Sequence, residues 1–226
     1  MNKWYAGLCE RFGLNAYVAG NYQKAEHWFR KLEQSEPTSI RVLRNLGVIL
    51  LAEGRPEEAE RYLLKEEKLY GASFYRHSAL ADLAYATGKR KEGARRYRLA
   101  LQEPECAEGG AAHHMSGLME KRLAMCEDEK RYAGTRKAME LFRQAEELRE
   151  GGSHQEAIEK FLESFALDET NWPALNNAAS IYMNALKLPA EAEPLFSQAF
   201  ELSHSIQVAR NVELCQQAID RGQKKK

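Results

Sequence analysis

Two histidines and two cysteines lie in one region in the middle of the chain, and these side chains are common zinc ligands. His113 and His114 are adjacent, and Cys106 and Cys126 flank them. Structural zinc sites usually pair ligands that are separated by roughly two to five residues. Neither cysteine has such a neighbour, and adjacent histidines do not easily share one metal ion. The spacing therefore predicts neither a metal site nor a bound cofactor.

Other patterns that carry chemistry are missing from the sequence as well. The chain contains no glycine-rich phosphate loop, no HExxH zinc motif and no GxSxG nucleophile turn. Its glutamates and histidines are dispersed along helix-forming stretches, where a solvated helix face accounts for them. We therefore predict a protein that is not an enzyme.

Composition narrows the class of protein further. Lys plus Arg equals Asp plus Glu, 33 against 33, so no overall charge favours nucleic acid or an acidic membrane surface. No apolar run approaches the roughly 18 residues of a membrane span, so membrane insertion is not expected. The first residues lack the apolar core of a signal peptide. The four cysteines are far apart and form no CxxC pair, which predicts reduced thiols in a cytoplasmic protein.

Small residues recur along the chain at a fixed period. Gly13, Gly47 and Ala81 are 34 residues apart, and each is followed by a second small residue twelve positions later. The turn-like glycines Gly20, Gly54 and Gly88 share the same period. Small residues allow two helices to approach closely, and a glycine just past a helix can adopt a left-handed backbone. The pattern predicts stacked helical hairpins, of which residues 40–72 are the best-preserved copy.

The period is interrupted once. The next small residue in the same role is Ala145, which follows Ala81 by 64 residues rather than 34. We expect the extra segment to contain one helix, from Leu118 to Tyr132. The predicted organisation is three hairpins in residues 1–106, an irregular insert in 107–135, two hairpins in 136–204, a capping helix in 205–221 and a disordered basic tail in 222–226.

These spacings resemble the tetratricopeptide repeat, a family of paired helices with a 34-residue unit. The matching residues are Leu46-Gly47 with Ala59 and Leu63, Ala25 and Phe29 with Pro37, Gly93 and Tyr97 with Ala100, Ala157 with Phe161, and Ala192 and Phe196 with Ala199. The resemblance implies an all-α solenoid, a right-handed superhelix of antiparallel helix pairs. The first helix of each pair would line a concave groove.

Members of this family generally act as scaffolds or adaptors that bind a peptide or protein segment in the groove. The resemblance therefore implies a protein or peptide partner for this chain. Two alternatives stay open. The chain could be a structural repeat protein whose copies associate into a homo-oligomer, or a repeat domain of a larger or membrane-tethered protein.

Helix geometry selects the groove residues, since these turn away from the partner helix of their own hairpin. Aromatic side chains with a few polar groups suit a recognition surface. The predicted partner-binding residues are Tyr17 in the first hairpin, Arg41, Arg44 and Asn45 in the second, Tyr75 and Tyr85 in the third, Phe142 in the fourth, and Trp172, Asn176 and Tyr182 in the fifth.

Asn45 and Asn176 are the sharpest of these candidates. An asparagine amide can pair with both the N–H and the C=O of a bound backbone, or instead with solvent or a neighbouring helix. Trp172 precedes a proline at a helix start, so packing between hairpins is its alternative role. One branch of the family grips a terminal carboxylate with a Lys/Asn/Arg set. That set is not matched here, because the other positions hold Glu10, Leu14 and Ala79.

Charge is unevenly distributed along the chain. Residues 89–98 are strongly basic, whereas residues 146–163 are rich in glutamate. Solvated outer helix faces explain both stretches, and an acidic partner or pairing between copies are the functional alternatives. Nucleic acid is not favoured, because no aromatic side chains interleave the basic residues. Whether the hairpins on either side of the insert form one groove depends on how the extra helix packs.

Overall fold

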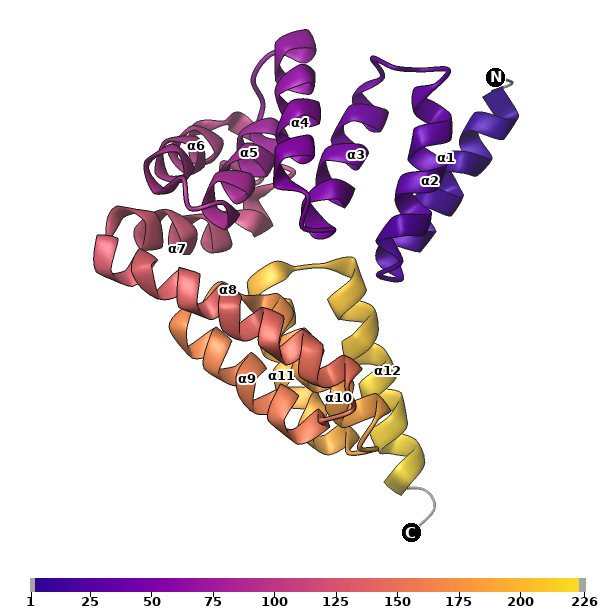
Figure 1. The fold of residues 1–226 in the computed structure, drawn as a ribbon, viewed down its shortest axis with the longest axis vertical. Helices are drawn as coiled ribbons and strands as arrows, with labels where there is room; N and C mark the ends of the chain where they lie inside the picture. The colour runs from indigo at the N-terminus through magenta and orange to yellow at the C-terminus, as the bar shows by residue number, and fades with distance from the viewer. Residues whose placement is uncertain (1–2, 224–226) are drawn as a thin grey trace. The chain divides into compact units, whose positions relative to one another are not determined.

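The computed structural model describes residues 3–223, and within them the regular elements are helices, with no strand. The chain divides into two compact units, residues 1–112 (unit 1) and 113–226 (unit 2), and each is described by itself. In both units, helices that follow one another along the chain lie side by side as hairpins (Figure 1). The expected all-α array of helix pairs is confirmed.

Unit 1 contains three hairpins, each made of two helices and a short turn. They are α1 (Lys3–Val18) with α2 (Tyr22–Glu33), α3 (Ile40–Ala52) with α4 (Pro56–Tyr70), and α5 (Phe74–Ala86) with α6 (Arg90–Gln102). A 3-10 turn, η1 (Pro104–Cys106), follows. Helix α2 packs on α3 and α4 packs on α5, so the hairpins of unit 1 form one stack (Figure 1).

The turns inside these hairpins depend on glycine. Gly20, Gly54 and Gly88 follow the first helix of each hairpin, with φ angles of 76°, 73° and 81°. An L side chain is strained in this left-handed region, because its Cβ comes too close to the backbone carbonyl. The predicted role of these glycines as helix terminators is confirmed.

Small residues mark the places where the two helices of a hairpin cross. A Cβ atom added at Gly47 would lie 2.7 Å from the side chain of Leu63, and one added at Gly13 would lie 2.7 Å from that of Phe29. Carbon atoms in contact normally lie about 3.5–4.0 Å apart. The close approach of α3 to α4 therefore requires that Gly47 carry no side chain.

The core of unit 1 repeats along the stack in the same way. Its buried apolar residues occur at helical spacing on the inner faces of the helices, and burial of such side chains is the main stabilising term in folding. They include Ala25, Phe29, Leu32, Val42, Leu46, Ile49, Leu50, Ala59 and Leu63.

Unit 2 begins with a 3-10 turn, η2 (His113–Met115), which leads into a stack of helices. These are α7 (Ser116–Glu127), α8 (Glu129–Glu150), α9 (His154–Leu167), α10 (Trp172–Asn184), α11 (Pro189–Ser203) and α12 (Ile206–Gln223). Helix α8 packs along α9, and α10 packs along α11 (Figure 1). Helix α9 also contacts α10, and α12 covers α11.

The insert differs in one respect from the single helix predicted between Leu118 and Tyr132. The helix breaks at Asp128, so that α7 ends at Glu127 and α8 starts at Glu129. The Asp128 carboxylate accepts hydrogen bonds from the backbone N–H groups of Lys130 and Arg131, at 2.9 and 3.0 Å. An aspartate that caps N–H groups in this way starts a new helix. Helix α8 consequently begins before residue 136, the predicted start of the fourth hairpin.

The last helix, α12, is amphipathic. Val208 and Cys215 are completely buried, whereas Ile206 and Leu214 are 86% and 43% exposed. The helix ends at Gln223, two residues later than expected. Residues 224–226, which belong to the predicted disordered tail, lie outside the described residues.

Candidate functional site

Apolar side chains on the first helices of unit 1 occupy equivalent positions, one repeat apart. Leu14 and Val48 are 34 residues apart, as are Tyr17 and Leu51. Leu14 and Val18 are each 40% exposed, while Tyr17, Val48 and Leu51 are half-buried. We call these five residues the α1–α3 stripe. It presents apolar surface to solvent on the face where the sequence predicted a groove.

Tyr17 is the polar member of the stripe. Burial raises the pKa of its hydroxyl to about 12, and the nearby Tyr22 hydroxyl and Asp82 carboxylate act in the same direction. The Tyr17 hydroxyl therefore stays protonated at neutral pH. A protonated phenol can donate one hydrogen bond and accept another.

Arg41, at the start of α3, is held by two carboxylates. Its guanidinium nitrogens lie 2.8 Å from Glu10 of α1 and 2.7 Å from Glu36, which precedes α3. The hydrogen bonds that Arg41 donates to Glu36 raise the pKa of Arg41 above its usual value. Since the contact with Glu10 joins the first hairpin to the second, Arg41 stabilises the stack and keeps fewer N–H groups for a ligand.

Arg44 contacts both neighbouring elements. Its guanidinium lies 2.8 Å from Glu66 of α4, and its central carbon lies 5.2 Å from the ring centre of Tyr75 of α5. Glu66 is fully buried, and its Oε1 also lies 3.3 Å from Arg76 Nη1. Two guanidinium groups compensate for the cost of burying this carboxylate. Glu66 therefore fixes Arg44 in place.

The other three candidates of unit 1 differ in accessibility. Asn45 is half-buried, and its Nδ2 donates a hydrogen bond of 2.6 Å to the backbone oxygen of Arg41, one turn earlier. Tyr75 is 40% exposed. Tyr85 is only 4% exposed, and its ring packs edge-on at 6.3 Å from that of Tyr97. Tyr75 thus reaches solvent, whereas Tyr85 is part of the packed interior.

Three of the four candidates in unit 2 are half-buried aromatic side chains. The ring of Phe142 lies 5.2 Å from that of Phe161, across the α8–α9 pair. Trp172, at the start of α10, packs against a core cluster that includes Val208 of α12. Tyr182 packs against the clusters that surround α10. All three contribute to packing between helices.

Asn176 is the fourth candidate in unit 2, and its amide is engaged on both sides. It is 9% exposed, and its Oδ1 accepts a hydrogen bond of 2.9 Å from Asn211 of α12. Its Nδ2 donates to Asn177 Oδ1 at 3.3 Å. The Asn176 amide therefore pairs with a neighbouring helix, which was the alternative to contact with a bound peptide. This pairing helps to hold α12 on α10.

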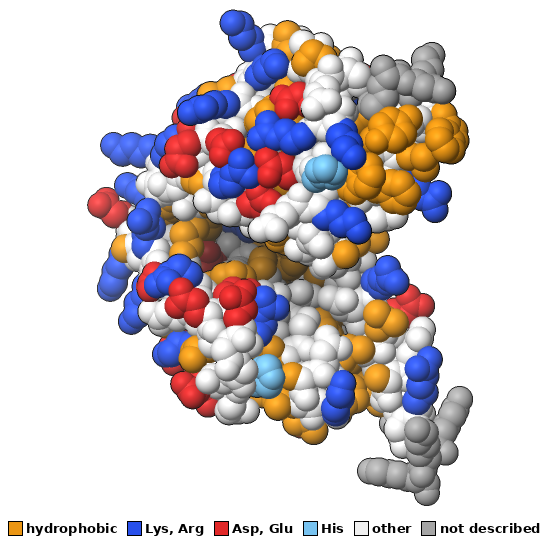
Figure 2. Space-filling view, turned by 45° about the vertical axis from the view of Figure 1, so that its right-hand side comes forward, with side chains coloured by type: hydrophobic (Ala, Val, Ile, Leu, Met, Phe, Trp, Pro, Cys, Tyr) orange, Lys and Arg blue, Asp and Glu red, His pale blue; other side chains and the backbone are white. Residues whose placement is uncertain are grey.

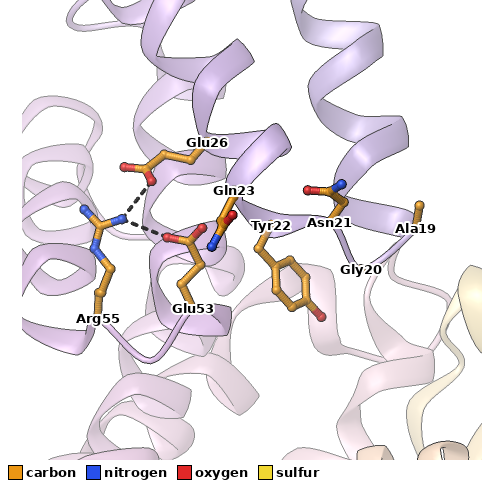
Figure 3. Close-up of a pocket in the computed structure, with 8 residues that line it drawn as sticks. All are labelled: Ala19, Gly20, Asn21, Tyr22, Gln23, Glu26, Glu53 and Arg55. Carbon is orange, nitrogen blue, oxygen red and sulfur yellow. Dashed lines mark hydrogen bonds and ion pairs between the residues drawn. The ribbon is translucent and has the colours of Figure 1, made fainter. Parts of the chain in front are cut away.

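A polar cavity of about 670 Å³ opens between the turn after α1 and the turn after α3 (Figure 3). Arg55 lies 2.7 Å from Glu26 and 2.8 Å from Glu53 at one end of this cavity (Figure 3). Burial by itself raises the pKa of Glu26, but hydrogen bonds from Arg55 and Arg30 hold it below its usual value. These charges compensate one another and join the first two hairpins.

Residues 3–223 contain no group of three or more His, Cys, Asp or Glu side chains placed to hold a metal ion. No helix in that range is both long and apolar enough to cross a membrane. The four cysteines are buried, and burial raises the pKa of the Cys215 thiol.

Two structural residues beside the candidates were not predicted. Glu66 and Arg76 hold Arg44 and the start of α5, and Arg76 also donates hydrogen bonds of 3.2 Å to the backbone oxygens of Tyr70 and Ala72. A signal for Glu66 was present in the sequence. One repeat earlier and one repeat later, the same position holds Leu32 and Ala100, both completely buried. A carboxylate at a core position requires a buried cation beside it.

No family model and no curated protein matches this chain. Several solved structures are similar to it. One structure of MamA is 17% identical, covers 88% of this chain and 91% of its own, and has a TM-score of 0.39. MamA from Desulfovibrio magneticus RS-1, residue 41 to the end, is 13% identical, covers 89% and 96%, and has a TM-score of 0.47.

YrrB, described as a TPR protein with an unusual peptide-binding site, is 13% identical, covers 91% of this chain and 90% of its own, and has a TM-score of 0.43. These identities and TM-scores are too low to define the fold, which is instead established by features of this chain. Those features are the 34-residue spacing, the helix pairs and the glycines where they turn and cross. By these features the chain is an all-α protein of stacked helical hairpins, and its repeat resembles the tetratricopeptide repeat.

Proposed function

We propose that this protein is a non-catalytic scaffold that binds a peptide or protein segment on the first-helix surface of unit 1. The observation that carries the proposal is the α1–α3 stripe, in which apolar side chains line up in register across two successive hairpins. Leu14 and Val18 leave 40% of their surface in water. A partner that covers them gains roughly 25 cal/mol for each Å² of apolar surface removed from water.

Polar groups beside the stripe would set the orientation of the bound segment. The Tyr17 hydroxyl is a protonated donor, the hydrogen bond that Asn45 donates to the Arg41 backbone oxygen orients its amide, and Glu66 fixes the guanidinium of Arg44. Preformed groups of this kind lower the entropy cost of binding. The favoured ligand is therefore a segment with apolar side chains, either helical or extended, and an extended segment would also offer backbone polar groups to Tyr17 and Asn45.

The proposal places the protein in the cytoplasm. The support is chemical, because four buried cysteines that are far apart in the sequence suit a reducing compartment. For Phe142, Trp172, Asn176 and Tyr182 in unit 2, partner binding stays a prediction. These residues pack between helices, so unit 1 offers the better-defined surface.

A peptide library screened against the purified chain would test the proposal. The affinity of a selected peptide is then measured by fluorescence anisotropy for wild type and for Leu14→Asp/Val18→Asp. We expect binding to weaken about tenfold or more, since two charges would replace apolar contacts at the centre of the surface. The matched control is Leu64→Asp on α4, because Leu64 is 43% exposed on a second helix.

The control variant should bind the peptide as wild type does. Equal affinity of wild type and the Leu14→Asp/Val18→Asp variant, with both folded by circular dichroism, would show that the peptide binds elsewhere. Loss of binding by the Leu64→Asp variant would move the site to the second helices.

A further inference from the structure

The N-terminal half of α1 exposes a row of large apolar side chains away from the stripe. Trp4, Leu8 and Phe12 are four residues apart, and Tyr5 lies two turns before Phe12 on nearly the same side. Trp4, Tyr5 and Phe12 are 72%, 40% and 43% exposed, and Leu8 is half-buried. We call these four residues the α1 end face. Figure 2 shows a gathering of hydrophobic side chains at the upper right of the molecule.

The later hairpins show what this face is built to contact. The residues equivalent to Phe12, one and two repeats later, are Leu46 and Leu80. Those two residues are 0% and 5% exposed, against 43% for Phe12. In the later hairpins the preceding second helix, α2 or α4, packs on the first helix. The α1 end face therefore resembles the surfaces through which later hairpins pack on one another. Among the described residues, no helix precedes α1 to cover it.

Helix α1 is also longer than its counterparts at the end that carries the aromatic residues. It has 16 residues, whereas α3 and α5 have 13 each. The added turn holds Trp4 and Tyr5, where the second hairpin has Thr38 and Ser39. The exposed apolar surface is thus an addition specific to the first hairpin.

A basic border runs along one side of this face. Lys24, His27 and Lys31 are three and four residues apart on α2, which places them on one side of that helix. The Lys31 ammonium lies 4.5 Å from the ring centre of Trp28, and the Trp28 ring lies 5.2 Å from that of Phe12. The border therefore adjoins the apolar surface directly. Basic side chains and a histidine edge the hydrophobic gathering in Figure 2.

We propose that the α1 end face docks an acidic amphipathic helix of a partner protein. A helix fits because the equivalent faces of α3 and α5 are covered by helices. Acidic residues fit because they would meet Lys24 and Lys31. A second copy of this chain that docked face to face would instead bring the two basic borders together. This docking site is separate from the α1–α3 stripe and does not depend on the function proposed for it.

Two synthetic helical peptides provide the test. Both carry Leu and Phe at positions i, i+3, i+4 and i+7, and the remaining positions are mostly Glu in one peptide and mostly Lys in the other. Fluorescence anisotropy with the full chain should show binding of the Glu peptide, with the Lys peptide bound about tenfold or more weakly. Failure of the Glu peptide to bind, or equal binding of the two peptides, would overturn the proposal.

Variants locate the site. Tyr5→Ser, at an exposed position, should weaken binding of the Glu peptide about tenfold. Lys24→Glu/Lys31→Glu leaves the apolar surface unchanged, so it should reverse the preference and bind the Lys peptide more tightly. Leu14→Asp/Val18→Asp should leave binding of the Glu peptide unchanged. A preference that charge reversal does not alter would contradict an acidic partner.

Analytical ultracentrifugation of the peptide-free chain tests the competing occupant. We expect wild type and the Tyr5→Ser variant to have the same mass, which should not depend on protein concentration. A concentration-dependent dimer that Tyr5→Ser abolishes, and that the Glu peptide fails to dissociate, would assign this face to a second copy of the chain.

Discussion

The two units stack helical hairpins with different polar chemistry. In unit 1, charged contacts between successive hairpins recur with the repeat. Arg55 Nη1 lies 2.7 Å from Glu26, and 34 residues further along Lys89 lies 2.7 Å from Glu60. The first contact joins the start of α4 to α2, and the second joins the start of α6 to α4. The repeat period thus applies to surface ion pairs as well as to the core.

Two further contacts of unit 1 recur in the same way. Tyr62 donates a hydrogen bond of 2.7 Å to Glu33, and one repeat later Arg96 donates one of 3.0 Å to Glu67. On the first helices, the position of the Arg41–Glu10 ion pair is taken one repeat later by Tyr75 and Arg44, as a cation–π contact. The same two repeat positions are thus in contact in both places, through an ion pair in one and a cation–π interaction in the other.

Unit 2 also holds its helices together with neutral hydrogen bonds. Ser164 Oγ donates to the backbone oxygen of Ala138 at 2.7 Å, and Asn171 donates to the same Oγ at 2.9 Å. Asn211 links α12 to Asn176. Half-exposed ion pairs are individually weak and are screened by salt, whereas a buried hydrogen bond is costly to break. We therefore expect the units to respond differently to core, salt and pH changes.

The largest effect should come from emptying the core position that recurs in every hairpin. Phe29 in unit 1 and Phe161 in unit 2 are both completely buried. Replacing either one by alanine should lower the unfolding free energy by about 3–5 kcal/mol. The substitution leaves a cavity, and the surrounding side chains relax only partly to fill it. If each unit unfolds as a cooperative body, Phe29→Ala should lower one calorimetric transition and Phe161→Ala another. Equal shifts of a single transition in both variants would contradict this division.

A smaller loss is expected from the buried hydrogen bonds of unit 2. Ser164 is 0% exposed, so Ser164→Ala leaves the amide of Asn171 without its acceptor. We expect a cost of about 1–3 kcal/mol in urea unfolding. The cost should be the same at low and high salt, because neither partner is charged. A cost that disappears in high salt would show that charge, not hydrogen bonding, dominates there.

The pH response of unit 1 should depend on His77. Burial lowers the pKa of His77 from its usual 6.5, and the nearby Arg96 lowers it further, against the opposing carboxylates of Glu103 and Glu67. The unfolded chain therefore binds a proton near pH 6.5 that the folded chain takes up only at lower pH. Stability should be fully present above pH 6.5 and should fall below it, by no more than about 1.4 kcal/mol for each pH unit.

Urea unfolding between pH 7.5 and 5.5 would measure this response. The His77→Gln variant should show a flatter pH dependence across that interval, whatever its stability at pH 7.5. The same slope in wild type and variant would assign the response to other groups.

The smallest effect is expected from a single surface ion pair. Lys89 and Glu60 are 48% and 36% exposed, so Lys89→Gln should cost about 0.2–1 kcal/mol at low salt and almost nothing in about 1 M salt. A double-mutant cycle with Glu60→Gln isolates the pair. A coupling energy that persists in high salt would mean that this contact is less screened than its exposure indicates.

Much of the fold followed from local patterns. The hairpin of residues 40–72 lies where it was expected, as α3 and α4, and the turn glycines have the left-handed backbone that their positions required. The break at Asp128 was missed because the apolar spacing continues across it. Its cause is a side-chain hydrogen bond to the backbone, which hydrophobic periodicity does not record.

The candidate site was harder to predict, because exposure depends on what the neighbouring helices contribute. Tyr75 and Tyr85 both lie on a first helix, yet one is 40% exposed and the other 4%. Asn45 and Asn176 looked equivalent in sequence. Asn45 bonds within its own helix, whereas Asn176 bonds to α12, a helix some 35 residues further along the chain. Helical periodicity identifies a face but not the element that covers it.

By itself, the sequence determined the helix pairs, their 34-residue period and the small residues at their crossings. These features depend on backbone preferences and side-chain volumes, which are local properties. The tertiary structure decided which polar groups are already used and which apolar groups stay in water. Those outcomes depend on contacts between distant residues, such as Glu66 with Arg44 and Arg76, and on the lack of a covering helix over Phe12 among the described residues.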